Sequence, residues 1–131
     1  MSDLIELATR TLESKYVYPI HTVAAALRTT SGEVVTAVNI DHFLGLVCAE
    51  TAALTIAMND GEYSFEEIVA VRKADDGTVS VVDLCGKCRQ ILHDYAPGVS
   101  VITTQGRRSI DDLIPLPFTR QQEKIKNALS G

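Results

Sequence analysis

The sequence has no excess of positive charge, no long apolar run and no basic leader. Its 131 residues carry 12 lysine and arginine side chains against 17 aspartate and glutamate side chains, a formal net charge of −5. Without a basic surface to neutralise phosphates, a nucleic acid polymer is not an expected partner. The longest apolar runs, such as Val23–Leu27, fall far short of the ~20 residues that cross a membrane, so no membrane partner is expected either. An acidic N-terminus without a basic and apolar signal segment favours a cytoplasmic location.

The length and composition favour a single folded domain over residues 1–131. At 14.2 kDa the chain matches the usual domain size of about 100–200 residues. Hydrophobic residues make up 46% and charged residues 22%, which is ordinary for a globular protein and wrong for a disordered one. We find no internal repeat, linker or low-complexity segment.

Helical and extended patterns alternate along the chain. Leu4, Leu7, Ala8 and Leu12 recur at helical spacing and predict a helix over residues 3–15, which Ser2 or Asp3 can cap. Other helices are predicted at residues 47–58, 86–96 and 119–129, with a helix cap at 109–112. Extended segments are predicted at residues 21–28, 33–40, 68–72, 79–82 and 99–103. This alternation favours an α/β fold with helices on both faces of a sheet, and the early hairpin around Ser31-Gly32 makes that sheet mixed.

The three cysteines are the residues most indicative of chemistry. Cys85-Gly86-Lys87-Cys88 places two thiols two residues apart, which alone fits a redox dithiol, half of a structural zinc site or part of a catalytic one. The remaining cysteine is Cys48, and an odd number of cysteines cannot all pair within one chain. A structural zinc takes four protein ligands, whereas three leave a position open for a reacting water. The count therefore favours an open metal site.

Glu50 lies two residues after Cys48, at the start of a predicted helix. Residues two apart in a first helical turn point in different directions, so Cys48 can bind a metal while Glu50 reaches toward a coordinated water and moves its proton. Both thiol motifs lie at predicted helix starts, where the helix dipole favours each thiolate by about 0.3–1 kcal/mol. Three thiolates carry more negative charge than one Zn²⁺ neutralises, so a positive group is expected nearby. Arg89, directly after Cys88, is the candidate to donate a hydrogen bond to one of the sulfur atoms.

Together, Cys48-Ala49-Glu50 and Cys85-Gly86-Lys87-Cys88-Arg89-Gln90 resemble the motifs of the zinc-dependent cytidine deaminases and of their relatives, the blasticidin S deaminases. The resemblance implies a three-layer α/β/α sandwich, zinc as cofactor, and hydrolytic loss of ammonia from a cytidine-type nucleoside, as in pyrimidine salvage. It implies that the three cysteines bind zinc and that Glu50 moves the protons. It also implies a homotetramer, or a dimer, whose active sites borrow residues from neighbouring subunits.

The resemblance further assigns residues to the substrate. Asn39 matches an asparagine that holds the ribose, and Asp41 is a shorter substitute for the family's glutamate. His21 stands where these enzymes place a phenylalanine against the base. Phe43 either stacks on the substrate across a subunit boundary or packs in the core, with the core slightly favoured. Ala49 completes the substrate set, and Gln90 joins Arg89 around the metal ligands.

Besides His21, three positions depart from the usual pattern of cytidine deaminases. Leu84 replaces a proline before the thiol pair, Thr51 replaces an arginine that hydrogen-bonds the thiolates, and Asp41 replaces glutamate. The missing arginine and the segment Val38–Phe43 are nearer to the blasticidin S branch. Two further functions therefore stay open: deamination of a modified cytosine nucleoside such as blasticidin S, and a zinc-stabilised binding module that has lost catalysis. A redox dithiol is a third possibility.

Several charged residues are expected to have no role in chemistry. Glu66-Glu67 and Asp111-Asp112 are interpreted as solvated charge and helix-cap residues. His93 is predicted to lie on the surface, and His42 is predicted to be a packed or interface histidine and not a metal ligand.

Overall fold

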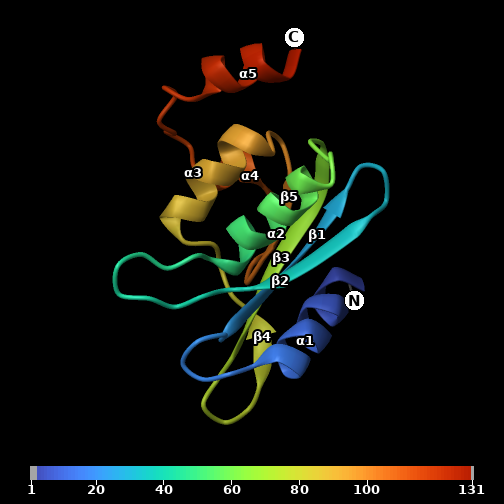
Figure 1. Ribbon diagram of the computed structural model, residues 1–131, viewed down its shortest axis with the longest axis vertical. Coiled ribbons are helices and arrows are strands. Elements are labelled where there is room, and N and C mark those ends of the chain that lie inside the picture. The colour runs from blue at the N-terminus through green and yellow to red at the C-terminus, as the bar shows by residue number, and fades with distance from the viewer. Residues whose placement is uncertain (1–2, 131) are drawn as a thin grey trace.

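The computed structural model describes residues 3–130, so the alternative cap Ser2 lies outside the described residues. The described residues form eleven helices and strands in chain order, and Figure 1 shows how they are arranged. They are α1 (Asp3–Lys15), β1 (Val23–Thr29), β2 (Val34–Val38), α2 (Ala49–Asn59), β3 (Phe65–Lys73), β4 (Val79–Val81), α3 (Gly86–Tyr95), β5 (Ser100–Thr103), β6 (Gly106–Ser109), α4 (Ile110–Leu113) and α5 (Gln122–Ser130).

The strands form one mixed sheet in the order β2-β1-β3-β5-β6, with β4 paired to one end of β3. The β3–β5 pair is parallel and the other pairs are antiparallel. The predicted hairpin joins β1 to β2, with Ala26 opposite Thr36. Gly32 takes a φ of +95° in its turn, a conformation that glycine adopts without steric cost. The prediction of a mixed sheet is confirmed.

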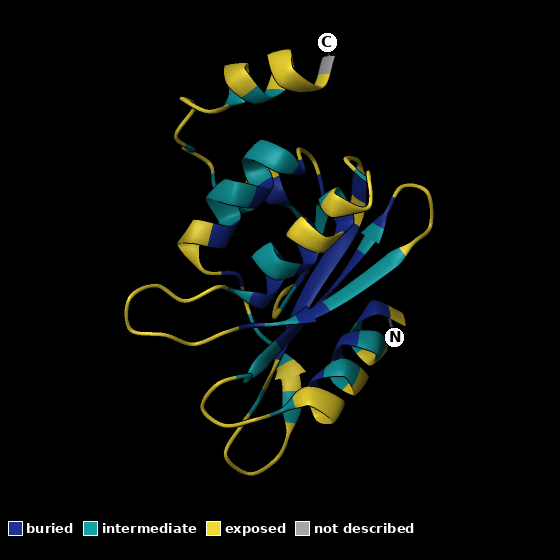
Figure 2. Ribbon diagram, viewed as in Figure 1, coloured by how far each residue is buried: buried dark blue, intermediate teal, exposed yellow. Residues whose placement is uncertain are grey.

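Helices cover both faces of this sheet. On one face, Leu4, Ala8 and Leu12 of α1 pack against alternate residues of β1 and β3. On the other face, α2 and α3 pack against the intervening strand residues, and alanines at 49, 53 and 57 let α2 lie close to the sheet. Figure 2 shows the buried residues concentrated on the strands and on the helix surfaces that face them. The predicted three-layer α/β/α architecture is therefore confirmed.

Most predicted elements are present, with differences at the strands. The helix over residues 3–15 has the predicted bounds, and Ser109 caps α4 by accepting a hydrogen bond from the Asp111 N–H at 3.3 Å. Strand β3 is longer than predicted at both ends, and α5 begins at Gln122 instead of residue 119. Strand β6 was not predicted, because Arg107 and Arg108 give it no apolar pattern; its pairing with β5 defines it.

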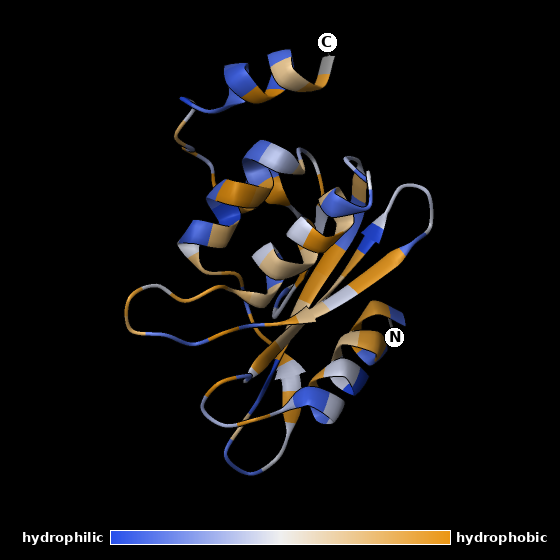
Figure 3. Cartoon of the chain, in the orientation of Figure 1, coloured by the Kyte–Doolittle hydropathy of each residue, from blue (hydrophilic) through white to orange (hydrophobic). Residues whose placement is uncertain are grey.

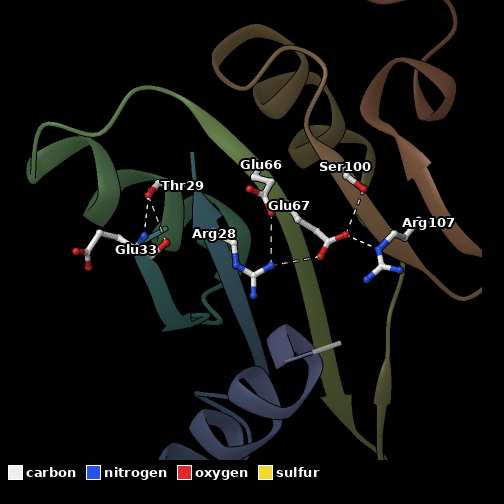
Figure 4. Close-up of polar contacts among 7 residues, drawn as sticks. All are labelled: Arg28, Thr29, Glu33, Glu66, Glu67, Ser100 and Arg107. Atoms are coloured by element: carbon white, nitrogen blue, oxygen red, sulfur yellow. Dashed lines mark hydrogen bonds and ion pairs between the residues drawn. The ribbon is translucent and has the colours of Figure 1, made fainter. Parts of the chain in front are cut away.

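Glu67 is buried, so its interpretation as solvated charge is wrong. The residue is 7% exposed and lies in β3, and its carboxylate faces partners from three other strands of the sheet (Figure 4). Its Oε2 accepts hydrogen bonds from Arg107 Nε at 2.6 Å and Ser100 Oγ at 3.3 Å. Its Oε1 lies 3.7 Å from Arg28 Nη1. A carboxylate away from water needs such partners, and here they connect β1, β3, β5 and β6 on the face that α1 covers.

The C-terminal segment is attached to α3. The Gln90 side chain donates to the Phe118 carbonyl at 2.8 Å and accepts from the Phe118 N–H at 3.0 Å. His93 contacts Gln122 of α5 through Nε2 and lies 3.4 Å from Asp111 Oδ1 through Nδ1. Its side chain is 14% exposed, so the prediction of a surface histidine is wrong.

Within residues 3–130, no helix combines the length and the hydrophobicity that crossing a bilayer requires.

Replacing Glu67 with alanine is predicted to lower the free energy of unfolding by about 1–3 kcal/mol, because Arg28 and Ser100 lose a partner that water cannot replace fully. Glu66→Ala is the matched control: Glu66 is the neighbouring residue, its side chain is 58% exposed and its ion pair with Arg28 spans 3.8 Å. Urea unfolding of both variants measures the difference. Equal midpoints for the two variants would show that the buried network does not stabilise the sheet.

Candidate active site

Three thiols meet where two helices begin. Cys48 is the N-cap residue of α2, Cys85 is the N-cap residue of α3, and Cys88 lies in the first turn of α3. Their Sγ atoms all lie within 4.8 Å of one another, and those of Cys48 and Cys85 are 3.6 Å apart. All three thiols are free. Residues far apart in sequence are thus brought to one point by the packing of α2 and α3 on the same face of the sheet.

The thiol cluster fits a metal ion. In a tetrahedral zinc site with Zn–S distances of about 2.3 Å, neighbouring sulfur atoms are about 3.8 Å apart, close to the spacing seen here. Within the part of the chain that the structure describes, no histidine or carboxylate joins the three cysteines as a fourth ligand. A tetrahedral ion held here would keep one position for a non-protein ligand.

The electrostatics of the thiols also favour a cation among them. Burial raises the pKa of Cys88, which is 1% exposed, and burial likewise raises the pKa of Cys48. Burial acts in the same direction on Cys85, but the Cys88 backbone N–H and the neighbouring thiols outweigh it and lower the pKa of Cys85. The Cys88 N–H lies 3.4 Å from Cys85 Sγ. Three thiolates at this spacing repel one another unless a positive charge lies between them.

Glu50 lies beside the cluster, in the first turn of α2. It is 5% exposed, and burial raises its pKa above the ordinary value of a glutamate. Glu50, Cys48 and Cys85 line one cavity of about 220 Å³. Its other lining residues are Val23, Asn39, Leu46, Ala49, Val82 and Asp83. A larger, open groove of about 820 Å³ between α1 and β2 holds no thiol and no buried carboxylate, so the smaller cavity is the candidate active site.

Two of the expected substrate residues, Asn39 and Ala49, line this cavity. The Asn39 Oδ1 atom accepts hydrogen bonds from the backbone N–H groups of Thr22 at 2.7 Å and Val23 at 3.0 Å. His21 Nδ1 lies 2.7 Å from the Asn39 carbonyl oxygen. Asn39 therefore holds the start of β1 next to the site, a structural role that sequence reasoning did not include.

Asp41 and Phe43 lie on the exposed loop between β2 and α2, outside the lining of the cavity. Phe43 is 90% exposed and stacks on His42 with ring centroids 4.6 Å apart. The expectation that Phe43 packs in the core is therefore wrong, and His42 is exposed as well. Leu44 is 81% exposed beside them, and Figure 3 shows apolar residues along this loop.

Arg89 has a different role from the predicted one. Its Nε donates to the Leu84 carbonyl at 2.9 Å and its Nη1 donates to the Leu113 carbonyl at 3.1 Å, so its guanidinium binds backbone oxygens and not a sulfur. It fixes the segment that leads into Cys85. Asp83 also holds this segment in place, because its two carboxylate oxygens accept hydrogen bonds from the Thr104 N–H at 2.9 Å and from the Thr104 hydroxyl at 2.8 Å. These bonds lower the pKa of Asp83.

The similarity to known proteins decides the family. No protein-family model matches the chain. It is 39% identical over 128 residues to the blasticidin-S deaminase of Bacillus cereus, covering 90% of this chain and 91% of that one. It is 33% identical over 115 residues to a cytidine deaminase of Mycobacterium tuberculosis, covering 85% and 84%. The crystal structure of a cytidine deaminase from Burkholderia pseudomallei matches with a TM-score of 0.74 and 30% identity, covering 90% of this chain and 100% of that one. The chain belongs to the cytidine deaminase family.

Membership of the cytidine deaminase family confirms the resemblance inferred from the two cysteine motifs, and it confirms the fold class. This member of the family is a hydrolytic deaminase, and its cluster of three thiols fits a metal site.

Asn39→Leu is predicted to lower the free energy of unfolding by about 1–3 kcal/mol, because two backbone N–H groups lose their acceptor. Asn39→Asp keeps an acceptor oxygen and should lose less. The control is Asn59→Ala, because the Asn59 amide donates to the Thr55 carbonyl on the exposed surface of α2. Thermal unfolding ranks the three variants. If Asn39→Asp were as unstable as Asn39→Leu, the role of Oδ1 as an acceptor would be wrong.

Proposed function

We propose that this chain is a zinc-dependent deaminase that converts a cytidine-type nucleoside to the uridine-type product and releases ammonia. The observation that carries the proposal is a cluster of three thiols, two of which, Cys48 and Cys85, line one small cavity together with the buried carboxylate of Glu50. Relatives named cytidine deaminase and blasticidin-S deaminase support the reaction class.

Cys48, Cys85 and Cys88 are the residues that would hold zinc, since thiolate ligands and a tetrahedral spacing of sulfur atoms suit this metal. Bound there, zinc would supply the Lewis acidity that makes water easier to deprotonate near neutral pH. The protein supports these ligands through Arg89 and Asp83, which fix the backbone before Cys85.

Glu50 is the residue that moves protons. Burial raises its pKa, so the carboxylate holds a proton more readily than an exposed glutamate does and can pass it on during the same reaction. It would accept a proton from the attacking water and deliver it to the base and to the departing amino group. A C–O bond forms as the C–N bond breaks, and water and the nucleoside are the only reactants needed.

The cavity walls and the exposed loop would supply the substrate contacts. Asn39 and Ala49 line the cavity, whereas Asp41, Phe43 and His21 lie outside its lining. Exposed apolar side chains on the loop between β2 and α2 are typical of an interaction surface. We therefore include in the proposal a homotetramer or dimer in which neighbouring subunits complete each site, and a role in pyrimidine salvage in the cytoplasm.

Deamination of a modified cytosine nucleoside such as blasticidin S is the second candidate. The identity of 39% to the Bacillus cereus blasticidin-S deaminase, against 33% to the Mycobacterium tuberculosis cytidine deaminase, favours it. A catalytically inactive binding module would need the same thiols but would not need the carboxylate of Glu50.

Ammonia release from cytidine, deoxycytidine and blasticidin S, measured side by side, tests these alternatives. We expect turnover of cytidine and deoxycytidine, and a loss of kcat of about 10²–10⁴-fold in Glu50→Ala with metal content unchanged. Glu62→Ala serves as the control, because Glu62 lies outside the lining of the cavity and its carboxylate accepts a hydrogen bond from the Ser31 hydroxyl at 2.8 Å. Turnover of the antibiotic alone would establish the second candidate. Full activity in Glu50→Ala would contradict the proton-transfer role.

A further inference from the structure

Thr51 contacts the thiol cluster. It follows Glu50 in the first turn of α2, is half-buried, and its Oγ1 atom lies 3.6 Å from the Sγ atom of Cys88. Both atoms belong to helices that meet at the site, so the contact joins the start of α2 to the start of α3. In the sequence, Thr51 differs from the arginine usual at this position in cytidine deaminases.

Cys88 is the most buried of the three thiols. At 1% exposure its side chain is shielded from water, which could otherwise donate to the sulfur. Cys85 is exposed and also faces the backbone N–H of Cys88. Arg89 uses Nε and Nη1 for the carbonyls of Leu84 and Leu113. Within residues 3–130, Thr51 is the only residue whose side-chain O–H or N–H group contacts a sulfur of the cluster.

A hydrogen bond to a metal-bound thiolate has two effects. It fixes the orientation of the ligand, and it withdraws negative charge from the sulfur so that the ligand donates less to the metal. Both effects matter most where three thiolates share one ion and no side-chain cation contacts them. A threonine hydroxyl meets this need without adding a charge inside the cavity that Glu50 lines.

We propose that Thr51 is a positioning residue for the metal centre, whose hydroxyl donates to the Cys88 thiolate, orients that ligand and offsets part of the negative charge on the sulfur. The inference rests on the proposed zinc-dependent function. A neutral side chain, on the helix that also carries Glu50, would then offset part of the negative charge of the thiolates.

The test compares Thr51→Val, which keeps the shape and removes the hydroxyl, with Thr51→Ser, which keeps the hydroxyl. Thr55→Val is the matched control, because the Thr55 hydroxyl lies one turn later and donates to the Thr51 carbonyl at 2.8 Å on the exposed surface. Competition between each protein and a chelator for Zn²⁺ measures the metal affinity. Cobalt(II)-substituted protein adds the thiolate-to-cobalt charge-transfer band, which reports the charge on sulfur directly.

We expect Thr51→Val to bind Zn²⁺ about 10–100-fold more weakly and to move the charge-transfer band to longer wavelength. Thr51→Ser should stay near the wild type, and Thr55→Val should match it. Wild-type affinity and an unmoved band in Thr51→Val would overturn the inference. If Thr51→Val does not fold, the comparison of Thr51→Ser with Thr51→Ala decides, since only the serine can donate. A wild-type chain that binds no Zn²⁺ would instead refute the proposed function.

Discussion

Convergence of three sulfur atoms at the starts of two helices is the constraint on which the rest of the site depends. Cys48 and Cys85 are both N-cap residues, so the thiols meet only if α2 and α3 lie on the same face of the sheet with their N-termini together. Alanines along α2 allow the close packing that this arrangement requires. A larger side chain at Ala53 would move the helix and separate Cys48 from the other two thiols.

The same packing determines the environment of Glu50. Because α2 begins at the thiol cluster, its first turn is buried between the sheet and α3, and a carboxylate placed there loses water. That burial raises the pKa of Glu50, which suits a group that must both accept and release a proton. The proposed metal-binding and proton-transfer roles are thus linked through one helical turn that carries Cys48, Glu50 and Thr51.

Local patterns were sufficient to predict most of the fold and the residues that meet at the candidate site. The cysteine spacing, the neighbouring glutamate and the apolar periodicity of the helices are each visible within short stretches of sequence, so the thiols, Glu50 and the bounds of α1 were predicted. Features that depend on distant partners were not. Strand β6 exists because it pairs with β5, and Glu67 is buried because Arg28 and Arg107 approach it from other strands. Arg89 binds carbonyls that only the folded chain brings near it.

The account is tested most directly at the metal itself, by elemental analysis of the purified protein combined with X-ray absorption at the zinc edge. It predicts one zinc ion per chain with three sulfur neighbours at about 2.3 Å and one oxygen or nitrogen neighbour at about 2.0 Å. A fourth protein ligand on the ion would close the position that the reaction needs. Zinc-free protein in which Cys85 and Cys88 oxidise reversibly to a disulfide would contradict the account altogether.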